Sequence, residues 1–174
     1  MSIHSSKFHL VCGYAASGKS TLARQLAREQ DAILLSEDRW LSALFAEELH
    51  TLADYVRCTA RLRNALGPHV VALLQNGQAV VMVMVMVMVM DFATNTVEAR
   101  AWLRELAQQA EVSAMLHFLD VSQEASWQRL VKRNQEGSHE FQLSKQQFDK
   151  LAAHFEPPSE AEGIPVTRHS AMKK

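Results

Sequence analysis

Gly13-Tyr14-Ala15-Ala16-Ser17-Gly18-Lys19-Ser20 is the stretch that decides the fold of this 174-residue chain. It matches the pattern G-x-x-x-x-G-K-[ST] at every fixed position, and the apolar residues 7–12 precede it. Glycines in such a loop let backbone N–H groups converge on phosphate oxygens, and the start of the following helix favours negative charge. The sequence therefore predicts a phosphate-binding loop between a first strand and a helix over residues 20–29, in preference to an accidental glycine turn.

The loop predicts where a nucleotide and its metal ion would bind. Lys19 is expected to reach the β- and γ-phosphates of ATP, and the Ser20 hydroxyl is expected to bind Mg²⁺. ATP and Mg²⁺ are thus the expected cofactors. The predicted cofactor-binding residues come from the loop, from the helix start and from one later arginine: Gly13, Ala16, Ser17, Gly18, Lys19, Ser20, Thr21 and Arg129.

Apolar runs typical of strands alternate with helical patterns along the chain, which predicts an α/β fold with a parallel sheet covered on both faces. Five strands are expected, over residues 7–12, 32–35, 79–90, 112–119 and 164–167. Helices are expected over residues 20–29, most of 38–75, 96–110, 122–134 and 144–155, with breaks near His50 and at Gly67-Pro68. Val97, Leu103 and Leu106 are predicted core residues of their helix, and the tail after Arg168 is expected to fray. We expect one domain over residues 1–174.

Composition excludes several other classes of protein. A content of 48% hydrophobic and 21% charged residues is incompatible with a wholly disordered chain. With 18 basic and 19 acidic residues, the net charge of −1 disfavours long nucleic acid as a partner. Two cysteines do not make a disulfide framework. No targeting signal is apparent, and residues 79–90 are too few for a membrane span. A cytoplasmic monomer or homodimer is the expectation.

Two acidic residues follow predicted strands, at the sheet edge where open α/β folds bind ligands. Asp38 follows the second strand, where it could accept a proton from an acceptor hydroxyl or simply favour a helix N-terminus; both interpretations stay open. Asp91 follows the third strand, and a second metal-binding or water-ordering carboxylate is favoured there. Thr94 and Asn95 could bind a phosphate or cap the next helix, and capping is favoured.

Arg129 and Arg133 lie four residues apart on one predicted helix, directly before a polar loop. A guanidinium that closes over a developing phosphoryl charge favours phosphoryl transfer, so a lid over residues 129–148 is one interpretation and a solvated face is the other. For Arg57, Arg61 and Arg63 a solvated face is favoured over an anion site.

Together these residues resemble the small P-loop kinases, and among them the ATP-binding proteins similar to polynucleotide kinase, zeta-toxin kinase and chloramphenicol phosphotransferase. The resemblance covers nearly the whole chain. It rests on the phosphate loop, Ser36-Glu37-Asp38, Asp91 with Asn95-Thr96 and Arg100, the R-x-x-x-R-N helix 129–134, and residues 155–158 with Glu162-Gly163.

The resemblance implies the strand order 2-3-1-4-5 and an ATP-dependent kinase. Lys19, Asp38 and Arg133 would be catalytic, with Asp38 as general base, and Ser20 and Asp91 would hold the metal. Polynucleotide-type kinases carry an arginine where this chain has Leu41, so the implied acceptor is an unidentified small molecule with a hydroxyl. The alternatives are a nucleotide-switched ATPase and a catalytically impaired ATP-binding protein, both acting through partners.

The third predicted strand contains VMVMVMVMVM over residues 81–90. Strands typically have about 5–6 residues, so the run is too long for a central strand of a small domain. Whole added repeats keep valine and methionine on opposite faces but change the register. Two interpretations stay open: an excess that projects or loops out, and one long buried strand in which methionine fills gaps.

Overall fold

β1 (Phe8–Cys12) is the central strand of an all-parallel sheet whose order is β2-β3-β1-β4-β5. The computed structural model describes residues 8–83, 95–136 and 143–170. The other strands within these residues are β2 (Ile33–Ser36), β3 (Val80–Val83), β4 (Ala114–Asp120) and β5 (Val166–Ser170). The predicted fold class and the predicted strand order are confirmed.

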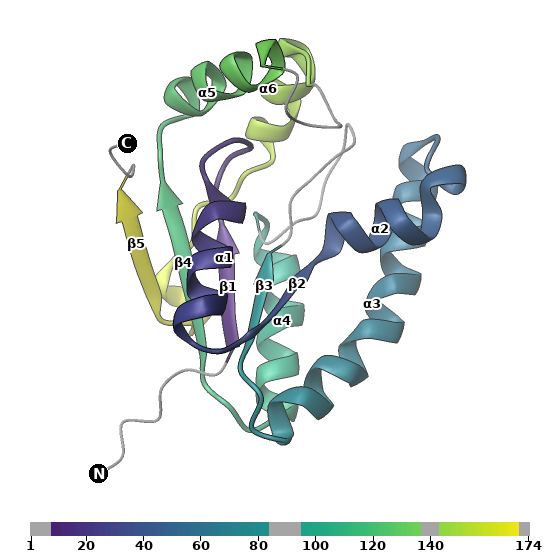
Figure 1. The fold of residues 1–174 in the computed structure, drawn as a ribbon, viewed down its shortest axis with the longest axis vertical. Coiled ribbons are helices and arrows are strands. Elements are labelled where there is room, and N and C mark those ends of the chain that lie inside the picture. Colours follow the sequence, from purple (N-terminus) through teal and green to yellow (C-terminus); the bar gives the residue numbers. More distant parts are fainter. Residues whose placement is uncertain (1–7, 84–94, 137–142, 171–174) are drawn as a thin grey trace.

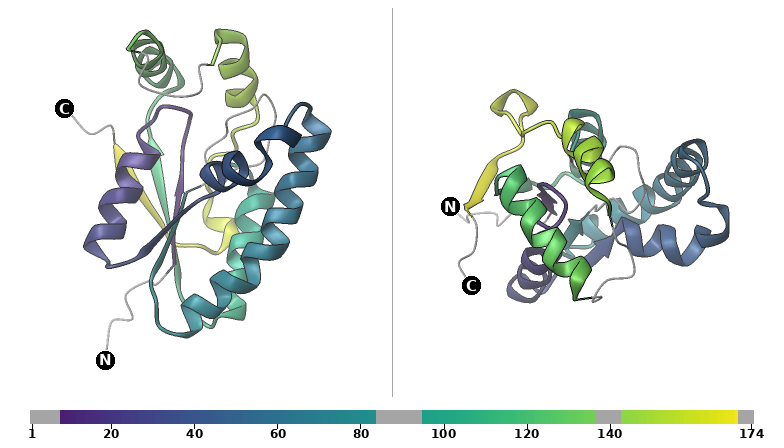
Figure 2. Two further views of the ribbon diagram at one scale, coloured as in Figure 1. Left: turned by 45° about the vertical axis from the view of Figure 1, so that its right-hand side comes forward. Right: turned by 90° about the horizontal axis from the view of Figure 1, so that it is seen from above.

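Helices cover both faces of the sheet (Figure 1). One face is covered by α1 (Lys19–Glu29), and the opposite face by α3 (Leu52–Gln75) and α4 (Val97–Gln109). Helix α2 (Glu37–Phe45) and the 3₁₀ turn η1 (Ala46–Glu48) lead into α3. Figure 2 shows α5 (Gln123–Gln135) and α6 (Lys145–Ala153) beyond the carboxyl end of the sheet, and η2 (Glu160–Glu162) precedes β5.

The strands alternate between two apolar layers, because successive side chains of a strand point to opposite faces. Leu10, Met82 and Leu116 pack on the side of α3 and α4. Val11, Val81, Val83 and Leu119 pack on the side of α1. The predicted separation of valine and methionine is therefore found for residues 81–83, while residues 84–90 of the repeat lie outside the described part of the chain.

The predicted break at Gly67-Pro68 is wrong, because α3 continues through Pro68. A proline inside a helix removes one backbone hydrogen bond and costs about 3 kcal/mol. Leu66, Val70 and Leu74 recur on one helix face and are buried against the sheet and α4, so tertiary packing outweighs that penalty. The predicted break near His50 is confirmed, and a capping box between Thr51 and Asp54 begins α3.

Two smaller expectations also need correction. Val97 is exposed, because it begins α4 on the side away from the core, whereas Leu103 and Leu106 are buried as predicted. The chain after Arg168 continues in β5, where His169 and Ser170 pair with the end of β4.

Within the described residues, no helix combines the length and apolar character that crossing a membrane requires.

Candidate active site

The loop between β1 and α1 has backbone angles that require glycine at two points. Gly13 has φ 144°, and a Cβ there would lie 3.1 Å from the carbonyl oxygen of Leu119. Gly18 has φ 111° and forms the N-cap of α1. An L-residue would be strained at both positions, so the two fixed glycines of the motif have a physical reason in this fold.

Lys19 is buried, with 4% of its surface exposed, and its ammonium donates to the carbonyl oxygens of Gly13 at 2.7 Å and Tyr14 at 2.8 Å. Burial lowers the pKa of Lys19 from 10.5 to about 8. The Asp38 charge opposes this shift and the Arg133 charge adds to it. The cation is thus held inside the loop, and charges from α2 and α5 act on it.

The start of α1 presents backbone donors that lack protein acceptors. Among the described residues, no protein atom accepts from the N–H groups of Gly18, Lys19 or Ser20, which precede the first intrahelical bonds. The buried hydroxyl of Ser17 also lacks a partner there. These donors fit phosphate oxygens, and the hydroxyls of Ser20 and Thr21 belong to exposed residues at the same helix end.

Asp38 lies in the first turn of α2, directly after β2. Burial and the neighbouring Glu37 raise the pKa of Asp38 well above 3.8, whereas Lys19 lowers it. Glu37 itself is 2% exposed and bonds the Arg63 guanidinium at 3.0 Å. A half-buried carboxyl with a raised pKa beside a buried cation is typical of functional sites.

Arg129 and Arg133 approach the loop from α5. Arg129 donates to the carbonyl oxygen of Ser17 at 3.1 Å. Burial lowers the pKa of Arg133, and its Nε is buried without a hydrogen-bond partner among the described residues. Arg129 therefore contacts the loop although the residue as a whole is exposed, and Arg133 is half-buried, so the lid role of both arginines stays a prediction.

Helices α5 and α6 pack directly on the phosphate loop. A buried cluster is formed by Leu130 of α5, by Leu143 just before α6, and by Phe148 of α6, and Ala15 and Ala16 of the loop pack against it. Their small side chains let the helices approach the loop closely. Residues 137–142 of the predicted lid lie outside the described ranges.

Arg57, Arg61 and Arg63 do not form an anion site. Arg57 and Arg61 are more than half exposed and pair with Glu48, and Arg57 also pairs with Asp54. Arg63 bonds Glu37. The predicted solvated face is confirmed for the first two arginines, whereas Arg63 is a partner of a buried carboxylate.

Sequence reasoning missed the position of Asn95. Its side-chain oxygen accepts from the Gly13 N–H at 3.1 Å, while Thr96 caps α4 by accepting from Ala99 N. The predicted capping role of Asn95 is therefore wrong.

Asp91 and Thr94 lie outside the described residues, so the predicted metal role of Asp91 stays a prediction. Within the described part of the chain, no cluster of three His, Cys, Asp or Glu side chains could hold a metal ion.

A family described as AAA domain matches residues 8–158 of the chain. No curated protein matches it. Among solved structures, a proposed kinase from Chloroflexus aurantiacus J-10-fl is 19% identical with a TM-score of 0.70, over 97% of this chain and 87% of that one. Kti12 from Chaetomium thermophilum, in complex with ADP-AlF3, is 16% identical with a TM-score of 0.65, over 96% and 90%. A sugar kinase from Janibacter sp. HTCC2649 is 16% identical with a TM-score of 0.61, over 98% and 88%. The similarity establishes a P-loop kinase-like fold.

Proposed function

The chain belongs to the AAA domain family whose model matches residues 8–158, and from this membership we propose that it is a kinase that transfers the γ-phosphoryl group of ATP to a hydroxyl of a small molecule. One observation carries the proposal: the carbonyl oxygens of Gly13 and Tyr14 hold the buried ammonium of Lys19 inside the loop, where the charges of Asp38 and Arg133, from two different helices, also affect its pKa. A base, a phosphate-binding cation and a second cation around one loop are the groups that phosphoryl transfer requires.

The loop residues would bind the nucleotide. The N–H groups of Gly18, Lys19 and Ser20 lack protein acceptors among the described residues, and phosphate oxygens would supply them. Gly13, Ala16 and Ser17 shape the loop, and Thr21 supports its helical end. The Ser20 hydroxyl, with Asp91 as the second ligand, would hold Mg²⁺, which supplies charge neutralisation at the phosphates.

Asp38 would act as the general base on the acceptor hydroxyl. Burial raises the pKa of its carboxyl, which brings its proton affinity closer to that of a base working near neutral pH. Arg133 would stabilise the transferring group, since its buried Nε lacks a partner among the described residues. Arg129 would keep α5 on the loop through the Ser17 carbonyl.

A sugar kinase among the structures of similar fold supports a small hydroxylated acceptor.

The test is a screen of pooled sugars, polyols, nucleosides and amino alcohols with γ-labelled ATP, with product detection by mass spectrometry. A labelled acceptor formed by the wild type and absent with Lys19→Met supports the proposal. Asp38→Asn should keep ADP affinity and slow transfer by about 10²–10⁴-fold. Labelled inorganic phosphate as the sole product would instead indicate a slow, nucleotide-switched ATPase. Failure to bind ATP would reject both functions.

A further inference from the structure

Asn95 connects three segments that are far apart in sequence. Its side-chain Oδ1 accepts from the N–H of Gly13 at 3.1 Å, and its backbone carbonyl accepts from the N–H of Glu156 at 2.8 Å. The Glu156 carboxylate accepts in turn from the N–H of Val97 at 2.7 Å. The first residue of the phosphate loop is thereby tied to the start of α4 and to the segment that follows α6.

An aromatic contact links the same segments a second time. The ring centroid of Tyr14, the second loop residue, lies 4.7 Å from that of Phe155, and the Phe155 ring stacks on that of Phe118 of β4 with a centroid distance of 5.8 Å. Phe155 directly precedes Glu156. The turn Gly13-Tyr14 is therefore held in two ways: Gly13 donates a hydrogen bond to Asn95, and the Tyr14 ring packs against Phe155. Phe155 is the neighbour of Glu156, which itself bonds Asn95.

The peptide groups on both sides of Gly13 are fixed. Asn95 binds the N–H of Gly13, and the ammonium of Lys19 binds its carbonyl at 2.7 Å. Gly13 has φ 144°, and glycine loses more conformational freedom on ordering than any other residue. A loop that is ordered before its ligand arrives avoids that entropy loss on binding.

We propose that Asn95, oriented by Glu156, is a positioning residue that pre-orders the phosphate loop at Gly13 and ties the loop to the segment after α6. This inference rests on the proposed function for its effect on nucleotide binding. Asn95 touches the loop backbone and acts through it, so removing its acceptor atom weakens nucleotide affinity without removing any of the proposed phosphate ligands.

Two measurements test this role. The first is amide hydrogen exchange at Gly13 in the protein without nucleotide, and the second is ADP affinity by calorimetry in the presence of Mg²⁺. Asn95→Leu removes the acceptor at similar size, and we expect faster Gly13 exchange and a three- to tenfold weaker affinity, about the worth of one hydrogen bond. Asn95→Asp keeps an acceptor oxygen and should restore Gly13 protection. Glu156→Ala should give an exchange rate between those of the wild type and Asn95→Leu.

Thr96→Ala is the matched control, since it removes the cap of α4 at the next position, where the Thr96 hydroxyl accepts from Ala99 N within the same helix. It should lower the melting temperature but leave Gly13 exchange and ADP affinity unchanged. Wild-type exchange at Gly13 in Asn95→Leu, or equal loss of affinity in Asn95→Leu and Thr96→Ala, would overturn the inference. A wild type that binds no ADP would reject the proposed function, while Gly13 exchange would still decide the role of Asn95.

Discussion

Arg100 of α4 and Glu162 of η2 form an ion pair in the interior, with side chains 0% and 8% exposed. Two hydrogen bonds join them, one of them from Nη2 to Oε1 at 3.0 Å. Burial by itself raises the pKa of Glu162, but the hydrogen bond from Arg100 and that from Ser159 N outweigh it and lower the pKa. The pair joins η2, which precedes β5, to α4, the helix that begins after Asn95.

Removing the carboxylate of this pair should destabilise the fold strongly. Glu162→Ala removes the carboxylate that accepts two hydrogen bonds from the buried Arg100 guanidinium, and breaking a buried ion pair from one side costs about 3–5 kcal/mol. The exposed pair Arg168–Asp120, with side chains 61% and 56% exposed, is the control, and Asp120→Ala should change stability by less than about 1 kcal/mol. Urea unfolding measures both. Equal losses of unfolding free energy in Glu162→Ala and Asp120→Ala would show that the buried ion pair stabilises the fold no more than the exposed one.

A second prediction concerns the buried charge of Lys19. Its pKa is about 8 in the folded protein against 10.5 as the ordinary value, so the unfolded chain binds its proton more tightly. The stability of the wild type relative to Lys19→Met should therefore rise as pH increases from 8 to 10.5, by a value on the order of 3 kcal/mol. Chemical unfolding across this range, with the variant as reference for all other titrating groups, provides the measurement. A pH-independent difference would mean that the ammonium is solvated.

The behaviour of Lys19 and Gly13 shows what the sequence could predict about the site. The loop, its helix and the strand order follow from local patterns, because the fixed glycines and the alternation of apolar runs act over short distances. The packing of helices α5 and α6 onto the loop does not follow, because these helices lie more than a hundred residues further along the chain.

Arg133 should contribute more to the transition state than to the bound ground state. Its buried Nε has no partner among the described residues, so a developing charge at the phosphoryl group would gain from it. Arg133→Ala is expected to weaken ADP binding by less than about threefold, but to weaken binding of ADP with aluminium fluoride by at least about tenfold. Calorimetry with and without fluoride distinguishes the two effects.

Arg129→Ala is the comparison for this experiment, because Arg129 contacts the Ser17 carbonyl. It should weaken both complexes to the same extent. If Arg133→Ala also weakens both equally, Arg133 is a ground-state ligand and its proposed catalytic role is wrong.

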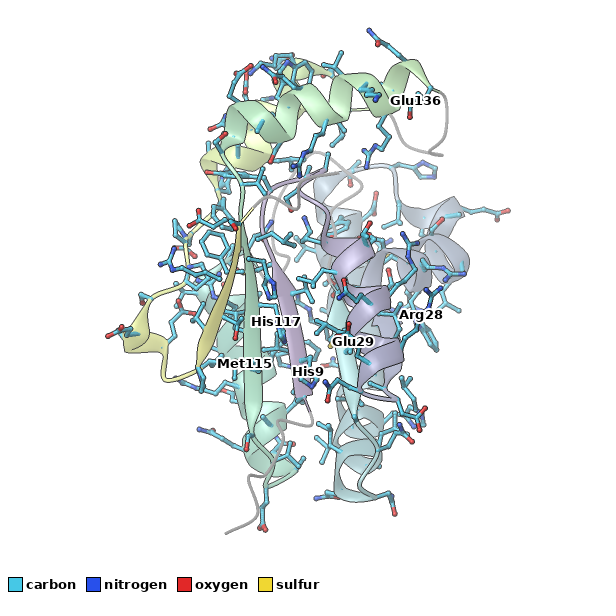
Figure 3. All side chains as sticks on the ribbon, turned by 60° about the vertical axis from the view of Figure 1, so that its left-hand side comes forward. His9, Arg28, Glu29, Met115, His117 and Glu136 are labelled. Carbon is cyan, nitrogen blue, oxygen red and sulfur yellow. The ribbon has the colours of Figure 1, made fainter. Side chains whose placement is uncertain are left out.

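Three histidines form a hydrogen-bonded line across the sheet. His117 of β4 lies between His9 of β1 and His169 of β5, with nitrogen–nitrogen distances of 3.0 Å on both sides. Figure 3 labels His9 and His117 on their neighbouring strands. Burial, and then the charges of His9 and His169, lower the pKa of His117 from 6.5 to about 4. The unfolded state therefore binds a proton that the folded state rejects between these values.

Stability should consequently fall as pH drops from 7 to 4, with a contribution of His117 on the order of 3 kcal/mol. His117→Gln keeps one donor and one acceptor for its two neighbours but does not titrate, so it should flatten this part of the pH profile. His69→Gln, which replaces an exposed histidine of α3, is the surface comparison for this experiment. An identical slope in wild type and His117→Gln would show that other groups cause the acid sensitivity.

Neither the histidine line nor the contact of Asn95 with Gly13 could be predicted from the sequence. The histidine line depends on register: His117 pairs with Val11 and Leu119 pairs with His169, so the three imidazoles meet along a diagonal of one sheet face. Spacing along the chain carries no information about such a diagonal. The diagonal requires this order of strands, and the relative shift of neighbouring strands determines which side chains meet.

The final prediction concerns the number of Val-Met repeats. On one side of residues 84–94, Val83 pairs with Val11 of β1 and Ser36 of β2, and on the other side Asn95 binds Gly13. A slip of β3 by one dipeptide would shift its pairing by about 6–7 Å, far beyond the roughly 0.5 Å tolerance of a working site. Because both anchors lie beside the phosphate loop, we expect a change in copy number to be absorbed between them.

Deletion of Val89-Met90, and insertion of one further Val-Met pair after Met90, test this expectation. ADP affinity and Gly13 amide exchange per folded molecule should stay within about twofold of the wild type, since that range is smaller than the loss of one hydrogen bond. Soluble yield should instead fall with added copies, because uncharged, β-prone segments promote aggregation. An affinity that rises and falls sharply with copy number would reject this prediction and make repeat length a control on the phosphate loop.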